Sequence, residues 1–304
     1  MKAEAKRNMA HSVHQRLLNV ARGTMRPFNE LLQHYAIERF LYRIGRSKHA
    51  EKLLLKGALL LRVWNVPMAR PTMDIDLLGR VTGTQDELAV ILKDCMQIEV
   101  EDDGLVYLPD TLRIEAITKE ADYQGTRMRF TAKLGNARVQ VQVDVGVGDI
   151  VYPRPVWIDF PTILGNESPH LLAYTPESAI AEKFQAMVAL GMANSRMKDY
   201  HDIWMLANTL EFDGKIFSEA IRRTFDRRET RLPELTPPAL NEKFHSDETK
   251  RTQWSAFIRG LKLKDALALE NVVVLAAQML MPPSIVMSAN KPFEMKWNPG
   301  GPWK

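Results

Sequence analysis

The 304-residue chain has a single cysteine, Cys95, and no apolar run long enough to cross a bilayer. One cysteine excludes an internal disulfide framework and a zinc site built from several cysteines. The longest apolar stretches, residues 53–61 and 272–281, are each interrupted by a polar residue and are shorter than the roughly 20 residues of a membrane-spanning helix. The first residues are too polar for a secretory signal. These absences predict a cytoplasmic protein without a membrane span.

The sequence also lacks the signatures of several common enzyme classes. No Gly-x-Ser-x-Gly elbow, Walker phosphate loop or Rossmann glycine pattern occurs, so hydrolase, P-loop and dehydrogenase assignments have no motif to support them. His201 has no second histidine at a metal-binding spacing, and the other histidines are scattered. A histidine-ligated metal site is therefore not expected.

What the chain does contain is enough apolar material for a sizeable core and an uneven distribution of charge. It has 45% hydrophobic and 26% charged residues and a net charge of +4. The first fifty residues hold ten basic and three acidic side chains, a net +7, which leaves −3 for the remainder. A second basic cluster consists of Arg222, Arg223, Arg227, Arg228 and Arg231. Either cluster could bind a polyanion such as RNA or could be an ordinary solvated helix face.

The periodicity of the apolar residues indicates how the chain is organised. Residues 12–62 show helical spacing, and helical patterns return after a connection rich in proline and glycine and end near residue 282. Between them, a helical insert near 85–95 separates short alternating or β-branched runs, and the expected strands are 73–78, 112–118, 127–132, 138–147 and 156–160.

The chain length favours two domains. We expect an α/β (α+β) domain over 1–165, made of N-terminal helices and a sheet. A helical C-terminal domain is expected over 166–304, with an irregular tail from about 282.

Two aspartates form the first candidate site. Asp74 and Asp76 are two residues apart, so on a strand their side chains share one face, with their stems about 7 Å apart. Ile75 and Leu77 then face the core. Two carboxylates on one face can hold a divalent metal, and hard oxygen ligands suit Mg²⁺. The plain alternative is a pair of surface acids on an edge strand.

Asp144 is a candidate third carboxylate. It lies on a strictly alternating strand whose valines, at positions 139, 141, 143 and 145, share the other face. Three carboxylates from neighbouring strands are the arrangement used in two-metal phosphoryl or nucleotidyl transfer. The alternative is a strand-end acid before Gly146.

Gly57 precedes a helical run, where a glycine lets a phosphate approach backbone N–H groups. A simple helix junction would place a glycine there as well.

Lys183 lies inside the apolar stripe of a helix that Thr175 and Pro176 are expected to begin. An unpaired ammonium facing inward is costly, so snorkelling or an anionic partner is expected. In the next helix, Asp199 and Asp202 share a face with apolar residues. A pair between Lys183 and Asp202 would satisfy both a structural and a catalytic interpretation.

These residues together resemble the AbiEii/AbiGii toxin family of nucleotidyltransferases. The similarity lies in the segments 56–58, 70–77, 181–187 and 194–202, whose order and spacing match over about residues 12–210. One departure is Ala58, where the family usually has serine or a second glycine. The distance from Gly57 to Asp74 is also longer than in the shortest family pattern.

The resemblance implies a polymerase-β-like nucleotidyltransferase core with a mixed sheet, flanked by N-terminal helices and a helical C-terminal domain. By position, Asp74 and Asp76 would hold Mg²⁺, with Asp144 as the candidate third ligand. Lys183 would bind the triphosphate, and Asp202, together with Asp199, would fill the late catalytic acid position. Nucleotide contacts are expected from Lys56, Gly57, Arg62, Thr72, Lys183, Arg196 and Asp199.

The expected function is that of a Mg²⁺-dependent nucleotidyltransferase toxin of a toxin–antitoxin or abortive phage infection system. It would transfer a nucleoside monophosphate from an NTP to RNA, at the tRNA 3′ end. The expected partners are this acceptor and a cognate antitoxin from a neighbouring gene, and the protein itself is expected to be a monomer. Two alternatives stay open: a nucleotide- or RNA-binding module without turnover, which Ala58 favours, and a transferase that modifies protein side chains.

Overall fold

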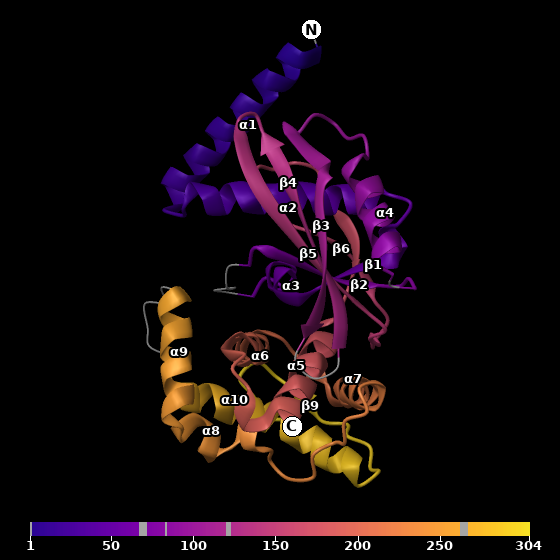
Figure 1. The fold of residues 1–304 in the computed structure, drawn as a ribbon. Helices are drawn as coiled ribbons and strands as arrows, with labels where there is room; N and C mark the ends of the chain where they lie inside the picture. Colours follow the sequence, from indigo (N-terminus) through magenta and orange to yellow (C-terminus); the bar gives the residue numbers. More distant parts are fainter. Residues whose placement is uncertain (1, 67–71, 83, 120–122, 262–266) are drawn as a thin grey trace. The chain divides into compact units, whose positions relative to one another are not determined.

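The computed structural model in Figure 1 describes the chain outside residues 1, 67–71, 83, 120–122 and 262–266, and it describes no side chains at 2–7, 118, 119, 123 and 124. The chain divides into two compact units. Unit 1 comprises residues 1–63, 72–148 and 156–173, and unit 2 comprises residues 64–71, 149–155 and 174–304. The boundary expected near residue 165 falls within the last segment of unit 1.

Unit 1 is built on a seven-stranded mixed sheet. Its strands are β1 (Leu53–Lys56), β2 (Asp74–Gly79), β3 (Leu105–Lys119), β4 (Tyr123–Leu134), β5 (Ala137–Val147), β6 (Val156–Asp159) and β7 (His170–Ala173). They lie in the order β3-β4-β5-β2-β1-β7-β6. The β2–β5 and β1–β7 pairs are parallel, and the other neighbouring pairs are antiparallel. The expected mixed α/β fold is therefore confirmed.

The helices of unit 1 are α1 (Lys2–Thr24), α2 (Phe28–Arg46), α3 (Leu60–Val63) and α4 (Gln85–Met96), with short 3₁₀ turns η1 (Ala50–Lys52) and η2 (Gly57–Leu59). Figure 1 shows α2 crossing one face of the long strands. On α2, the centroid of the Phe40 ring lies 4.8 Å from that of Phe130 and 5.4 Å from that of Tyr107. Thr84 caps α4 by accepting the Glu87 N–H. One face of the sheet thus packs against α2 and forms the core. Polar side chains of the strands lie on the opposite face.

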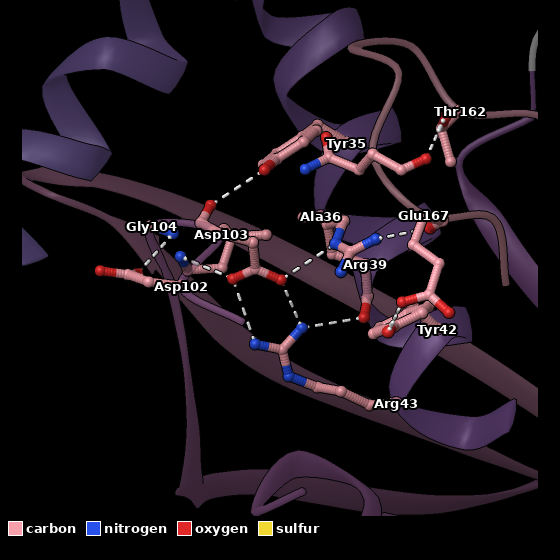
Figure 2. Close-up of polar contacts among 12 residues, drawn as sticks. Tyr35, Ala36, Arg39, Tyr42, Arg43, Asp102, Asp103, Gly104, Thr162 and Glu167 are labelled. Carbon is pink, nitrogen blue, oxygen red and sulfur yellow. Dashed lines mark hydrogen bonds and ion pairs between the residues drawn. The ribbon is translucent and has the colours of Figure 1, made fainter. Parts of the chain in front are cut away.

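A buried ionic network ties α2 to the loop before β3 (Figure 2). The Asp103 carboxylate accepts hydrogen bonds from Arg39 Nε at 3.0 Å and from Arg43 Nη1 at 2.7 Å and Nη2 at 3.1 Å. Tyr35 donates to the Asp103 carbonyl. Arg39 also donates to the carbonyl of Glu167, in the loop before β7, at 3.0 Å. The network joins segments distant in sequence on the helical side of the sheet.

The sequence-based assignment of helix throughout residues 12–62 is wrong at its end, where Leu53–Lys56 forms β1. The three leucines are fully buried, and this strand pairs with β2 on one side and β7 on the other. Leucine favours helices, but in so short a segment pairing with neighbouring strands outweighs this preference. The strand β7 was also not expected, and β3 begins before the expected 112–118.

Unit 2 consists mainly of helices. They are α5 (Pro176–Leu190), α6 (Met197–Thr209), α7 (Gly214–Arg227), α8 (Glu242–Ser246), α9 (Glu248–Leu261) and α10 (Leu269–Ser288), with 3₁₀ turns η3 (Gly191–Ala193) and η4 (Pro238–Leu240). The predicted start of α5 is confirmed: Thr175 is the N-cap and Pro176 occupies the first turn. The helix α10 contacts α6 and α7 and forms much of the core of this unit.

The expected end of the helices near residue 282 is wrong, because α10 continues through Pro282 and Pro283 to Ser288. The burial of Met281, Pro283 and Ser284 holds this turn in place despite the two missing N–H donors. Of the described helices, α10 is the one whose length and apolar composition would allow a membrane span, and 44% of its most apolar window is buried inside the protein. Core helices share these properties.

The C-terminal tail wraps onto unit 2. A two-stranded sheet pairs β8 (Phe212–Asp213) with β9 (Lys296–Trp297). Trp297 is fully buried and Trp303 is 6% exposed. Their indole N–H groups donate to the carbonyls of Ala207 at 2.8 Å and Met279 at 2.9 Å. The segment without periodicity is therefore anchored by buried tryptophans.

Candidate active site

The sheet face opposite α2 carries the first group of candidate residues. Asp74 and Asp76 are half-buried on β2, and Ile75 and Leu77 point into the core. Lys56 on β1 lies directly opposite Asp76, and Asp144 on β5 lies directly opposite it on the other side. Directly opposed residues share a face, so the predicted common face of Asp74 and Asp76 is confirmed and Asp144 lies on the same face.

Gly57 lies against Asp76. Its φ of +76° is in the left-handed region that favours glycine. A Cβ added at position 57 would stand 2.8 Å from Asp76 Cβ and 2.9 Å from Cγ, closer than real side-chain atoms approach. Glycine at position 57 therefore allows the backbone to turn from β1 into η2. It also leaves room for the Asp76 side chain beside the turn.

The structure adds a partner for Asp144 that the sequence interpretation did not include. Arg127 on β4 lies opposite Asp144 and binds it with two hydrogen bonds of 2.8 Å, from Nε and Nη2. The Asp144 side chain is 5% exposed. The alternation of Arg127, Arg129 and Lys133 with apolar residues on β4 was the signal for a cationic face here.

Two of the carboxylates on this face are suitable ligands for a hard cation. Asp74 and Asp76 offer carboxylate oxygens, the donors that Mg²⁺ prefers, and Gly57 leaves the Asp76 carboxylate uncrowded on its side. Among the described residues, however, no group of three or more histidine, cysteine or acidic side chains is placed to hold a metal ion. The arrangement fits two carboxylate ligands, with Asp144 engaged by Arg127.

The remaining nucleotide-binding candidates of unit 1 are dispersed. Thr72 is half-buried just before β2, whereas Arg70 and Pro71 lie outside the described residues. Arg62 on α3 donates to His34 Nε2. Burial, with Arg62 and Arg26 nearby, lowers the pKa of His34 to about 3, so the imidazole is neutral and can accept. Ala58 is buried, so the position that lacks the family's hydroxyl faces the interior.

Unit 2 holds the second group around Lys183. Lys183 Nζ donates to Asp199 Oδ1 and to Asp202 Oδ2, each at 2.9 Å. Both carboxylates are 1% exposed and the lysine side chain is 15% exposed. Arg196 Nε adds a bond of 2.6 Å to Asp199 Oδ2. The predicted pair of Lys183 with Asp202 is confirmed, and the cluster includes Asp199 and Arg196 as well.

The charges of this cluster compensate one another. Burial alone would raise the pKa of Asp199, but Lys183 and Arg196 outweigh it and hold the pKa below its usual value. Asp199 is therefore ionised at neutral pH. The cost of removing these charges from water can exceed the energy gained by pairing them, so a buried ion pair need not stabilise the fold. The cluster is therefore compatible with a functional as well as a structural role.

The late basic cluster is largely occupied by carboxylates. Arg222 and Arg223 both pair with Glu219, and Arg228 pairs with Asp149 at 3.0 Å. These contacts favour the solvated-face interpretation over a polyanion site. In the N-terminal cluster, Arg39 and Arg43 are buried in the Asp103 network, and Lys2, Lys6 and Arg7 lie outside the described side chains.

Comparison with known protein families gives one match over most of the chain. A family described as "Nucleotidyl transferase AbiEii toxin, Type IV TA system" matches residues 39–274. No curated protein matches the chain.

Two solved structures from Helicobacter pylori are similar. The first, provisionally described as a nucleotidyltransferase, shows 14% identity, covers 86% of this chain and 93% of its own, and has a TM-score of 0.45. The second, JHP933, shows 14% identity, covers 83% of this chain and 87% of its own, and has a TM-score of 0.40.

Proposed function

The chain belongs to the AbiEii family of nucleotidyl transferase toxins of type IV toxin–antitoxin systems, and from this premise we propose that it transfers a nucleoside monophosphate from an NTP to RNA, at the tRNA 3′ end. The observation that carries the proposal is the placement of the half-buried Asp74 and Asp76 on one sheet face, with Asp76 beside Gly57. Carboxylates on such a face can act on a triphosphate that approaches from solvent.

In this proposal Asp74 and Asp76 would hold Mg²⁺, and the bound ion would supply positive charge to the phosphate oxygens. Gly57 lets a phosphate reach the backbone N–H groups of η2, a role left to the backbone because Ala58 has no hydroxyl. Lys56, beside Asp76, and Arg62 and Thr72 add positive charge and hydrogen-bond donors for the nucleotide. Asp144 serves as a further carboxylate once Arg127 is drawn to another anion.

For unit 2 we propose that Lys183 binds the triphosphate and that Asp202 fills the late catalytic acid position. Asp199 and Arg196 position the lysine through the contacts already described. The family supports these roles, and the buried ion pairs support a fixed lysine ammonium.

The type IV toxin family implies an antitoxin partner. We propose that this antitoxin is encoded by a neighbouring gene, that the protein acts in the cytoplasm as a monomer, and that the pair serves in defence against phage. Coexpression with the neighbouring gene product should relieve the toxicity that the chain causes alone.

The decisive experiment incubates the purified protein with each α-³²P-labelled NTP, Mg²⁺ and total tRNA. Label is expected in RNA with the parent and not with Asp76→Asn. Omission of Mg²⁺ or addition of EDTA should abolish transfer. Label in protein instead of RNA, or equal transfer by Asp76→Asn, contradicts the proposal. Nucleotide binding without any transfer would select the binding module.

A further inference from the structure

One face of the strands β3, β4 and β5 carries a set of cations that the proposed nucleotide site does not use. On β4, Arg127, Arg129 and Lys133 alternate with buried residues such as Met128 and Phe130. They therefore point to the face opposite the core. This is the same face that carries Asp76 and Asp144.

The strand register adds further cations to this face. Arg138 on β5 lies opposite Lys133 on β4, and Arg113 on β3 lies opposite Arg129. Because directly opposed residues share a face, these cations form two rows. Glu115, opposite Arg127, is the acid that faces them from β3. We call this set, Arg113, Arg127, Arg129, Lys133 and Arg138, the cationic face.

Part of the cationic face is neutralised internally. Arg127 pairs with Asp144, and Arg129 pairs with Glu115 at 3.0 Å. In contrast, no salt bridge joins Arg113, Lys133 or Arg138 to another residue within the described part of the chain. Arg113 and Arg138 are exposed and Lys133 is half-buried. These three side chains hold positive charge available to an external anion.

The cationic face leads to the carboxylates. Arg127 lies in the same cross-strand row as Asp76, through Asp144. From that row to Lys133 is six residues of β4, about 20 Å at the usual rise per residue. The row after Arg129 contains Thr131 and Gln140, joined by a hydrogen bond of 3.0 Å. On β4 and β5, polar side chains thus run without a break from the outer cations to the candidate active site.

We propose that the cationic face binds the phosphate backbone of the RNA acceptor and guides its end to Asp74 and Asp76. The inference rests on the proposed function, since it names the path of that acceptor. A polyanion fits better than an acidic protein segment because the cations are spread along about 20 Å of strand instead of gathered in one pocket. None of the described side chains on this face of the three strands is aromatic. The face therefore has no aromatic platform on which bases could stack, and its cations are suited to phosphates.

The test compares RNA binding by charge variants. The probes are total tRNA and a fluorescein-labelled single-stranded RNA 20-mer of mixed sequence, and the readout is fluorescence anisotropy between about 50 and 200 mM KCl. The variant Arg113→Glu/Lys133→Glu/Arg138→Glu is expected to bind at least about 100-fold more weakly. The slope of log affinity against log salt should fall by about three, roughly one for each lost phosphate contact.

Two matched variants sharpen the test. Lys93→Glu reverses an exposed charge on α4, which packs against α2, and should leave RNA affinity unchanged. Replacing the same three cations by glutamine removes charge without adding repulsion, so it should weaken binding by about tenfold or more with a smaller salt slope. Affinity for a fluorescent NTP should be unchanged in all three variants, which shows that the fold is intact.

Unchanged RNA affinity in the triple glutamate variant overturns the inference, as does an equal loss in Lys93→Glu. A parent protein that binds neither RNA probe at 50 mM salt overturns it too. Failure of the proposed function gives a different pattern: no label transfer to RNA, although binding to RNA still depends on Arg113, Lys133 and Arg138.

Discussion

The Cα of Gly57 lies directly against the side chain of Asp76, so closely that a Cβ at position 57 would stand 2.8 Å from Asp76 Cβ. This contact joins the turn after β1 to the carboxylate strand β2. Position 57 therefore requires glycine for two reasons, the lack of space for a side chain and the positive φ. The same contact predicts how the site responds to one added methyl group.

Gly57→Ala should reduce nucleotidyl transfer at least about 100-fold, because the methyl group displaces the Asp76 carboxylate. Gly165→Ala is the matched control: Gly165 has a similar φ of +71° but nothing within 4 Å of an added Cβ. Both variants carry the backbone strain, about 1 kcal/mol or more. Initial rates with labelled NTP test the prediction, and equal loss of activity in both variants would show that strain alone matters.

Lys183→Met should destabilise the protein by about 3–5 kcal/mol, because it removes the cation from a buried cluster with two carboxylates. The double variant Lys183→Met/Asp202→Asn should recover part of that stability. Thermal unfolding followed by circular dichroism gives the stability, and label transfer gives the activity. If Lys183 binds the triphosphate, the double variant regains stability without activity. Recovery of both would reduce the lysine to a structural role.

Asp103→Asn should destabilise unit 1 by about 3–5 kcal/mol at pH 7, because Arg39 and Arg43 lose their shared carboxylate. Burial raises the pKa of Asp103, but hydrogen bonds from Arg43 and Arg39 outweigh it and lower the pKa from 3.8. The stabilisation is thus present above pH 3.8 and declines as pH falls through the lower folded-state pKa. Asp102→Asn, on the exposed neighbour, should change stability by less than about 0.5 kcal/mol in urea unfolding.

Glu38→Gln should remove a pH dependence of stability. Burial raises the pKa of Glu38 to about 8, so the folded state keeps a proton that the unfolded state releases near pH 4.5. Stability of the parent therefore falls as pH rises between these values, by up to about 1.4 kcal/mol per unit. The buried neutral His34 acts in the opposite direction only below its usual pKa of 6.5. Urea unfolding between pH 6.5 and 8 separates the effect of Glu38 from that of His34, and parallel curves for parent and variant would contradict the prediction.

Trp303→Ala should destabilise unit 2 by about 3–5 kcal/mol through the lost core volume, with the hydrogen bond to Met279 lost as well. Trp157→Ala removes a tryptophan that is 44% exposed and should have an effect smaller by several-fold. Thermal unfolding of the two variants checks this. A harmless Trp303→Ala would mean that the tail is not part of the core.

Local patterns accounted for much of the fold. The strands around residues 73–78 and 138–147, the helix begun by Thr175 and Pro176, and the inward-facing Lys183 all follow from periodicity and capping, which depend on near neighbours. The β1 segment could not be predicted this way, because three leucines carry no period and only pairing on both sides makes them a strand.

The sequence by itself determined that Asp74 and Asp76 share a face, because the period of a strand is two, and the family motifs identified the nucleotidyltransferase class. Only the tertiary structure decided that Asp144 lies opposite Asp76, that Arg127 binds it, and that Arg113 and Arg138 join the same face. Register between strands depends on pairing across the sheet, and no local pattern encodes which residues become neighbours.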